Sequence, residues 1–212
     1  MTRRAPDGGV PEPDLPSELL GDEWERVEAS VERLFGVDGA DIRGHTVVYD
    51  DDRLRRAVER TTGGRLDQSW RFFFATRLQF RPPLPPGIGP AMVKPMVQNE
   101  GVRAFVDRLE GRGVTGVERG RTERVRTERG RVRFRQVTGE LAVDTGSVPV
   151  EGWVGVSARG DLQLTGGAYP TTPLSSVLDG ERVADLDADL VAALDRSGSA
   201  HRGALFDLLK AV

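Results

Sequence analysis

The strongest constraint on the fold is a series of segments in which apolar and polar residues alternate along the chain. In residues 68–81 one face of an extended strand would carry Trp70, Phe72, Phe74, Leu78 and Phe80. The other face would carry Arg71, Arg77, Gln79 and Arg81. Because successive side chains of a strand point to opposite faces, this alternation predicts a half-buried antiparallel strand.

Four further segments are expected to form two hairpins. Residues 115–128 and 131–144 are separated by Arg129-Gly130, and residues 148–158 and 161–169 by Arg159-Gly160. Strands that follow each other through tight turns pair as an antiparallel meander. A shorter strand is expected at residues 45–49, which are rich in β-branched residues.

Helices are expected before, between and after these strands. Ser17 precedes apolar residues at helical spacing, namely Leu20, Trp24, Val27, Val31 and Leu34. Asp50 or Asp51 can cap a second helix that ends at Gly63-Gly64, and Asn99 can cap a third. Leucines from residue 186 to residue 209 predict helices near the C-terminus.

Without a regular alternation of strands and helices, these elements indicate an α+β fold rather than an α/β fold. We expect one antiparallel sheet of five or six strands, a meander of hairpins, with helices packed mainly on one face. Residues 1–16 carry four prolines and are expected to form a disordered tail. Residues 17–212 are expected to form a single domain.

Composition excludes several classes of chemistry. The chain has no cysteine and two histidines, so we expect no disulfide, no metal site and no cofactor. No apolar run approaches the roughly 18 residues of a transmembrane helix, and the expected location is the cytoplasm. Of the 30 basic residues, 28 are arginine, which is typical of a GC-rich genome and indicates a haloarchaeal context.

The sharpest anomaly is the arginine-rich hairpin. The net charge of the chain is −3, yet residues 112–135 hold nine arginines and three glutamates, a local charge of +6. With Val125 opposite Phe134 and Thr127 opposite Val132, one face of the ribbon would carry Arg124, Arg126, Arg131, Arg133 and Arg135. Such a face could bind an anionic partner, or acidic side chains of the same protein could neutralise it. The absence of aromatic residues on it disfavours nucleic acid as the partner.

A second anomaly is the proline-rich connection between residues 82 and 97. Its apolar residues could form a lid over a pocket or a docking surface, or they could cap one end of the core. The candidate residues are Leu84, Ile88, Met92, Val93 and Met96.

These anomalies favour a non-enzymatic binding module, whose partner and oligomeric state the sequence leaves open. A first alternative is a protein that binds a small apolar ligand between Trp70, Phe72, Phe74 and Trp153. A second is an enzyme that uses acidic, tyrosine or histidine side chains, for instance His45 and Tyr49 near Asp50.

Overall fold

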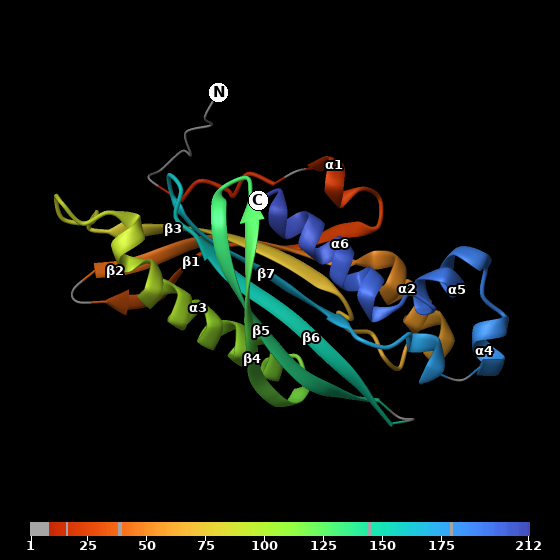
Figure 1. Cartoon of the computed structure of the whole chain (residues 1–212). Coiled ribbons are helices and arrows are strands. Elements are labelled where there is room, and N and C mark those ends of the chain that lie inside the picture. The colour runs from red at the N-terminus through yellow and green to blue at the C-terminus, as the bar shows by residue number, and fades with distance from the viewer. Residues whose placement is uncertain (1–8, 16, 38–39, 144–145, 179) are drawn as a thin grey trace.

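Hydrogen bonds between neighbouring strands join seven strands into one antiparallel sheet, in the order β1-β2-β3-β7-β6-β5-β4 (Figure 1). The protein is represented by a computed structural model that describes residues 9–15, 17–37, 40–143, 146–178 and 180–212. The strands are β1 (Trp24–Val37), β2 (Ala40–Asp51), β3 (Phe72–Arg81), β4 (Val114–Thr127), β5 (Gly130–Val143), β6 (Gly146–Ser157) and β7 (Leu162–Pro170). The helices are α1 (Ser17–Leu20), α2 (Asp52–Thr62), α3 (Pro90–Gly111), α4 (Gly180–Ala184), α5 (Ala188–Leu194) and α6 (Gly198–Lys210).

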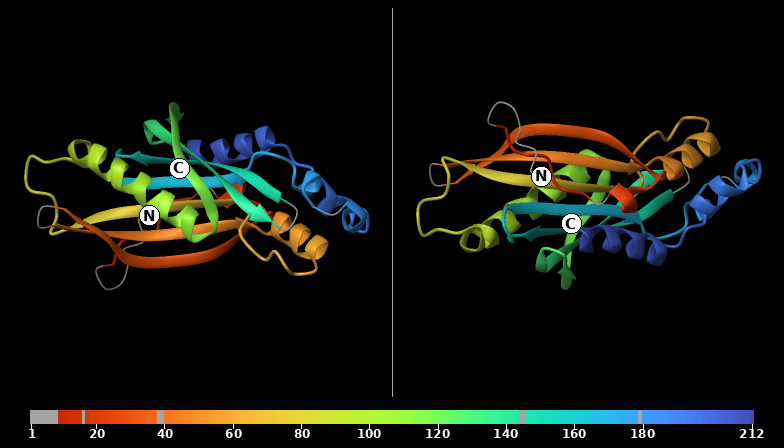
Figure 2. Two further views of the ribbon diagram at one scale, coloured as in Figure 1. Left: turned by 90° about the horizontal axis from the view of Figure 1, so that it is seen from below. Right: turned by 90° about the horizontal axis from the view of Figure 1, so that it is seen from above.

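The predicted α+β class is confirmed, with seven strands instead of five or six. Strands β4 to β7 form the expected meander, and β1, β2 and β3 extend the sheet beyond β7. The sheet is strongly twisted, so that β1 and β4 at its two edges run in different directions (Figures 1 and 2). None of the described helices is both long and apolar enough to cross a membrane.

Both faces of the sheet are covered, because apolar side chains alternate onto both of them. On one face Phe72 and Phe74 of β3 pack against Phe105 of α3, and α2 and α5 extend this cluster. On the other face Phe134 and Trp153 pack against Phe206 of α6. Most helices therefore lie on the first face, as expected, while α6 and the short α1 lie on the second.

The helix predicted from residue 17 is wrong beyond Leu20, since Trp24–Val37 form the edge strand β1. This strand pairs with β2, and its register shifts between Arg26 and Glu28 and between Arg33 and Phe35. Each irregularity moves the apolar residues out of a strict two-residue period. The resulting spacing of three and four residues resembles that of an amphipathic helix.

The proline-rich connection is shorter than expected, because α3 begins at Pro90 rather than after Asn99. Gly89 is the N-cap, and Pro90 follows at the first helical position. A backbone N–H there would have no acceptor within the helix, so proline is tolerated. Pro95 lies inside the helix, near its start. Proline near residue 95 was therefore a poor indicator of loop structure.

The predicted cap of the second helix is confirmed at Asp51. Its Oδ1 accepts a hydrogen bond from the backbone N–H of Leu54 at 2.9 Å, and Gly63 ends α2 in the left-handed region. The other carboxylate oxygen of Asp51 lies 2.7 Å from Nη1 of the buried Arg71. One aspartate thus caps a helix and neutralises a buried guanidinium.

Part of the segment expected to be a disordered tail lies against the sheet. Val10 is buried, and its carbonyl accepts a hydrogen bond from Nδ1 of His45 at 3.0 Å. Glu12 forms an ion pair with Arg26 at 2.8 Å. Residues 1–8 and 16 of that segment lie outside the described residues.

His201 of α6 is buried, with 2% of its surface exposed, against the ring of Tyr169. Burial, together with the positive charges of Arg71 and Arg196, lowers the pKa of His201 to about 3. The neutral imidazole is therefore the form that the folded protein favours at neutral pH.

We predict that His201 makes the folded state sensitive to acid. Between its ordinary pKa of 6.5 and about 3, the imidazole takes up a proton in the unfolded chain but not in the folded one. The contribution of His201 to the free energy of unfolding is therefore fully present above pH 6.5. Below pH 6.5 it falls by up to about 1.4 kcal/mol per pH unit. Urea unfolding of the wild type and of His201→Leu across this range should give a shallower pH dependence for the variant. Equal slopes would contradict the prediction.

We also predict opposite effects for two glycine-to-alanine substitutions. A Cβ on Gly167 of β7 would lie far inside van der Waals contact with the carbonyl oxygen of Phe72 in β3. Gly167→Ala should thus lower the free energy of unfolding by about 3 kcal/mol, since two paired backbones must move apart. Gly203 lies exposed in α6 with no atom near its Cβ position, so Gly203→Ala should raise stability by about 0.5–1 kcal/mol. Thermal denaturation measures both.

Candidate anion-binding site

A cleft opens where the tip of the β4–β5 hairpin separates from the rest of the sheet. β5 pairs with β6 from Val143 to Phe134, which lies opposite Gly155. Beyond this point residues 130–133 pair with β4 alone. The tip is held instead by α6, because the backbone N–H of Glu128 donates to the carbonyl of Lys210 at 2.8 Å.

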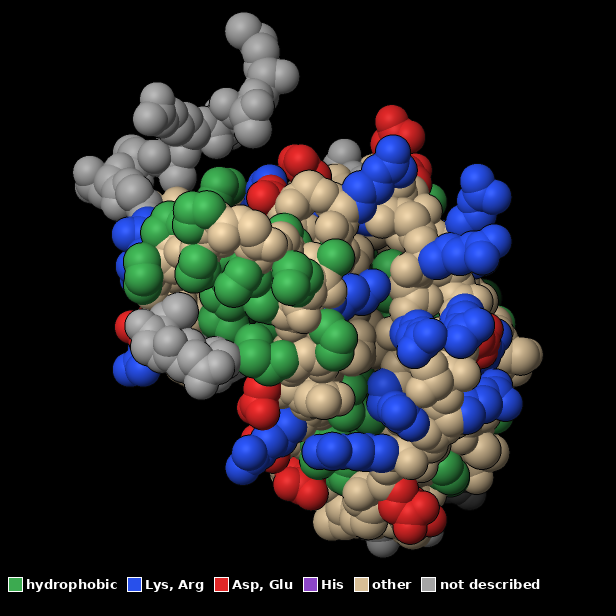
Figure 3. Space-filling view, turned by 60° about the vertical axis from the view of Figure 1, so that its left-hand side comes forward, with side chains coloured by type: hydrophobic (Ala, Val, Ile, Leu, Met, Phe, Trp, Pro, Cys, Tyr) green, Lys and Arg blue, Asp and Glu red, His purple; other side chains and the backbone are tan. Residues whose placement is uncertain are grey.

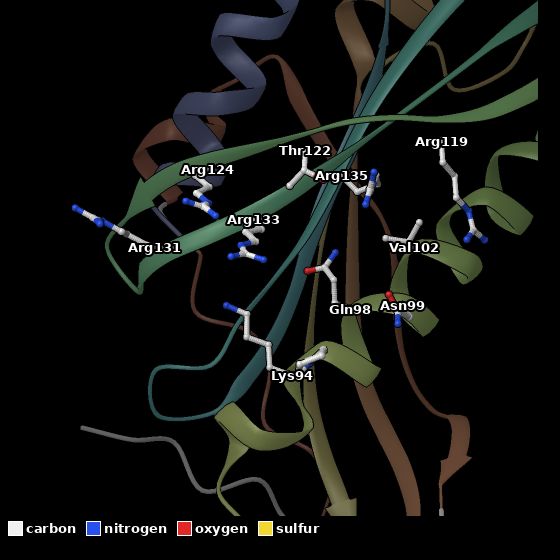
Figure 4. A pocket seen from close by; sticks show the side chains of 11 residues that line it. Lys94, Gln98, Asn99, Val102, Arg119, Thr122, Arg124, Arg131, Arg133 and Arg135 are labelled. Atoms are coloured by element: carbon white, nitrogen blue, oxygen red, sulfur yellow. The ribbon is translucent and has the colours of Figure 1, made fainter.

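The side chain of Gln98 takes the place of the departing strand. Its Oε1 accepts a hydrogen bond from the backbone N–H of Val156 at 3.0 Å, and its Nε2 donates to the carbonyl of Val154 at 3.4 Å. Val156 is buried and lies beyond the last residue of β6 that β5 pairs, so without Gln98 its N–H would have no partner from β5. Gln98 therefore ties α3 to β6 and forms the floor between the helix and the hairpin (Figure 4).

The cleft has a volume of about 950 Å³ and lies between α3 and the hairpin. From α3 it is lined by Lys94, Pro95, Gln98, Asn99 and Val102. From the hairpin it is lined by Arg119, Thr122, Arg124, Arg131, Arg133 and Arg135. Figure 4 shows Arg133 and Lys94 extending toward each other from opposite sides.

The hairpin register explains why the arginines gather on this side. Arg124 lies opposite Arg133 and Arg126 opposite Arg131, whereas Val125 lies opposite Val132. The predicted pairing of Val125 with Phe134 is thus wrong by two residues on β5. A shift of two residues leaves each side chain on its predicted face, so the valines still pack under α6.

Four of the five predicted arginines line the cleft: Arg124, Arg131, Arg133 and Arg135. Arg126 instead borders a second hollow of about 350 Å³ beside Asp207 and Lys210 of α6. The sequence pattern does not indicate Arg119 and Lys94 as residues of the same site. Two irregularities in β4 obscure the face on which Arg119 lies, and the prolines around Lys94 suggest a loop where α3 begins.

The charge of the cleft is not neutralised by described residues. No described carboxylate lies within 4.0 Å of the basic groups that line it, and Arg135 instead donates to the carbonyl of Gly120 at 2.9 Å. Neighbouring acids have other partners: Glu123 pairs with Arg202 at 2.6 Å, and Asp161 pairs with Arg77. The arginine face is therefore not neutralised by acids of its own fold within the part of the chain described.

Positive charges in the cleft also act on each other. Burial, and then the charge of Arg133, lower the pKa of Lys94 from its ordinary value. A like charge that disfavours the ammonium form would be offset by an anion bound between the two groups. The chemistry of this donor set suits an anion with several oxygen atoms, because guanidinium groups bind such oxygens in pairs.

The proposed apolar pocket has no matching arrangement of residues. Phe72 and Phe74 belong to the core under α3, where their rings lie 6.3 and 5.7 Å from that of Phe105. Trp153 packs on the opposite face of the sheet, against α6. Of the lid candidates, Leu84, Val93 and Met96 pack against the core, and Ile88 and Met92 are exposed.

The residues suggested for an enzyme do not converge either. Tyr49 packs with the cluster under α6, while Asp50 accepts a hydrogen bond from Ser69 at 2.5 Å. As neighbours in β2 these two side chains point to opposite faces of the sheet. Within the described ranges, no three carboxylate or imidazole groups could hold a metal ion.

The first prediction for this site concerns Gln98, which forms the floor of the cleft. We expect Gln98→Met to leave the N–H of Val156 without an acceptor and to lower the free energy of unfolding by about 1–3 kcal/mol. Amide hydrogen exchange should become faster at Val156. Asn99→Ala is the control, because Asn99 is exposed on the next helical position. Unchanged exchange in Gln98→Met would contradict this role.

Comparison with known proteins places the chain in a family without assigning an activity. No curated protein and no solved structure matches the chain. A family model described as a domain of unknown function, DUF6517, matches residues 12–212. This match covers nearly all of the described sheet and helices, the cleft included. The chain therefore belongs to the DUF6517 family.

Proposed function

We propose that this protein is a binding module whose cleft between α3 and the β4–β5 hairpin holds an anionic partner. The observation that carries the proposal is a group of cations that no described carboxylate neutralises, around a cleft of about 950 Å³. The group consists of Lys94, Arg119, Arg124, Arg131 and Arg133.

Electrostatics supports an anion as the partner of the cleft. Arg124 and Arg133 lie directly opposite each other in the ladder, where like charges destabilise a pair of strands. An anion between them would convert this repulsion into charge-assisted hydrogen bonds, each worth about 1.5–3 kcal/mol. The fold keeps the arginines in this position because the opposite face of the hairpin is buried under α6.

The lining of the cleft also favours one class of anion. Phosphate-like groups offer several oxygen atoms to the guanidinium fork. Bases of single-stranded nucleic acid need aromatic side chains for stacking, and none occurs among the residues that line the cleft. A cytoplasmic location and a haloarchaeal context stay predictions from composition.

Binding of tripolyphosphate tests the proposal. We predict that isothermal titration calorimetry at low salt detects binding to the wild type, and that Arg133→Glu weakens it at least about tenfold, as loss of a charge-assisted contact requires. High salt should weaken binding to the wild type because it screens charges at an open cleft.

Arg53→Glu is the matched control. Arg53 lies exposed on α2, away from the cleft (Figure 1), and its substitution changes the net charge by the same amount. Equal loss of affinity in both variants would assign binding to net charge alone. Binding that Arg133→Glu leaves intact would exclude the cleft.

A further inference from the structure

Exposed apolar side chains lie at and just before the start of α3, the helix that forms one wall of the basic cleft. Figure 3 shows one face of the molecule, with hydrophobic side chains gathered on one side and lysine and arginine side chains on the other. Met92 is 67% exposed and Ile88 is 40% exposed, both at the start of α3 or directly before it. We call Ile88 and Met92 the apolar ledge.

The ledge and one wall of the cleft belong to the same part of the chain, at and just before the start of α3. Met92 of the ledge and Lys94 of the cleft are two residues apart in α3, so they point to different sides of the same helical turn. Half-buried neighbours, Val93 and Met96, pack against the core and hold this turn in place. Several prolines precede it and restrict the connection from β3.

We propose that this face docks on the surface of an anionic lipid bilayer. Headgroup phosphates would bind in the cleft, and Ile88 and Met92 would enter the boundary between headgroups and acyl chains. This inference rests on the proposed function of the cleft and adds the identity of the partner.

Charge complementarity and the ledge together favour a bilayer over other anionic partners. Stable attachment to a membrane surface needs two signals, typically basic residues together with inserted apolar groups. The face in Figure 3 carries groups of both kinds. A soluble anion or a nucleic acid would use the cations and leave the ledge in water. Single exposed apolar residues are ordinary, but these two lie at the start of the helix that lines a basic cleft without described carboxylate partners.

Vesicle co-sedimentation tests the inference. We predict that the wild type binds vesicles of equimolar phosphatidylglycerol and phosphatidylcholine, and that it does not bind vesicles of phosphatidylcholine alone. Ile88→Ser/Met92→Ser should weaken binding at least about tenfold, because serine lacks the favourable free energy that isoleucine and methionine gain on transfer from water into the bilayer. Binding of tripolyphosphate by this variant should stay unchanged, since its cleft is intact.

Val31→Ser is the matched control for the ledge. Val31 of β1 is 43% exposed, close to the value of Ile88. It pairs with His45 of β2 and points to the face of the sheet that α3 does not cover. This variant should bind vesicles like the wild type. Circular dichroism and thermal denaturation establish that each variant is folded.

Absence of cysteine from the chain allows a direct measurement of contact. An environment-sensitive fluorophore on Met92→Cys should shift to the blue when anionic vesicles are added, whereas the same label on Val31→Cys should not. This readout reports burial of the ledge in lipid, independently of affinity.

Three results would overturn the inference. The first is vesicle binding that does not depend on Ile88 and Met92. The second is binding of tripolyphosphate in the cleft without binding of anionic vesicles, in which case the proposed function stands and its partner is a soluble anion. The third is tight binding of a DNA duplex without vesicle binding, which would assign the cleft to nucleic acid. If the wild type does not bind tripolyphosphate, the proposed function itself is contradicted.

Discussion

The backbone of β6 needs hydrogen-bond partners along both of its edges, and the way it obtains them shapes the candidate site. β7 covers one edge, while β5 covers the other only as far as Gly155. At that point the amide of Gln98 bonds to the carbonyl of Val154, the residue before Gly155, and to the N–H of Val156, the first residue that β5 does not pair. One glutamine thereby gives the N–H of Val156 an acceptor where the hairpin tip leaves the sheet, and a cleft opens in the space between.

The position of the hairpin depends on two faces with opposite preferences. Val125, Val132 and Phe134 are buried under α6, which fixes the orientation of the ribbon. The arginines must then point toward α3, where like charges face each other across the ladder. Burial of the apolar face offsets this repulsion, so the fold can maintain a concentrated positive charge. Among the described residues no carboxylate pairs with these arginines, and a nearby acid such as Glu123 pairs with an arginine elsewhere, Arg202.

Regular patterns in the sequence predicted the central strands correctly. Two segments with irregular patterns, β1 and the start of α3, were predicted wrongly. The hairpins around Arg129-Gly130 and Arg159-Gly160 follow from uninterrupted alternation, which two strands can satisfy by facing one core. β1 was mistaken for a helix because two register shifts give its apolar residues a helical spacing. The start of α3 was mistaken for a loop because proline is tolerated near the start of a helix as well as in a turn.

By itself, the sequence determined the α+β class, the face of the ribbon that carries arginine, and the absence of cysteine chemistry. These features depend on residue type and on the two-residue period of a strand, both of which are local. Only the tertiary structure decided that four of those arginines line one cleft with Lys94 and Gln98, that Arg126 lies apart, and that Ile88 and Met92 are exposed near the start of the helix that lines the cleft. Such neighbours are brought together by the pairing of distant strands and by the packing of α3 and α6, which no periodicity within one segment encodes.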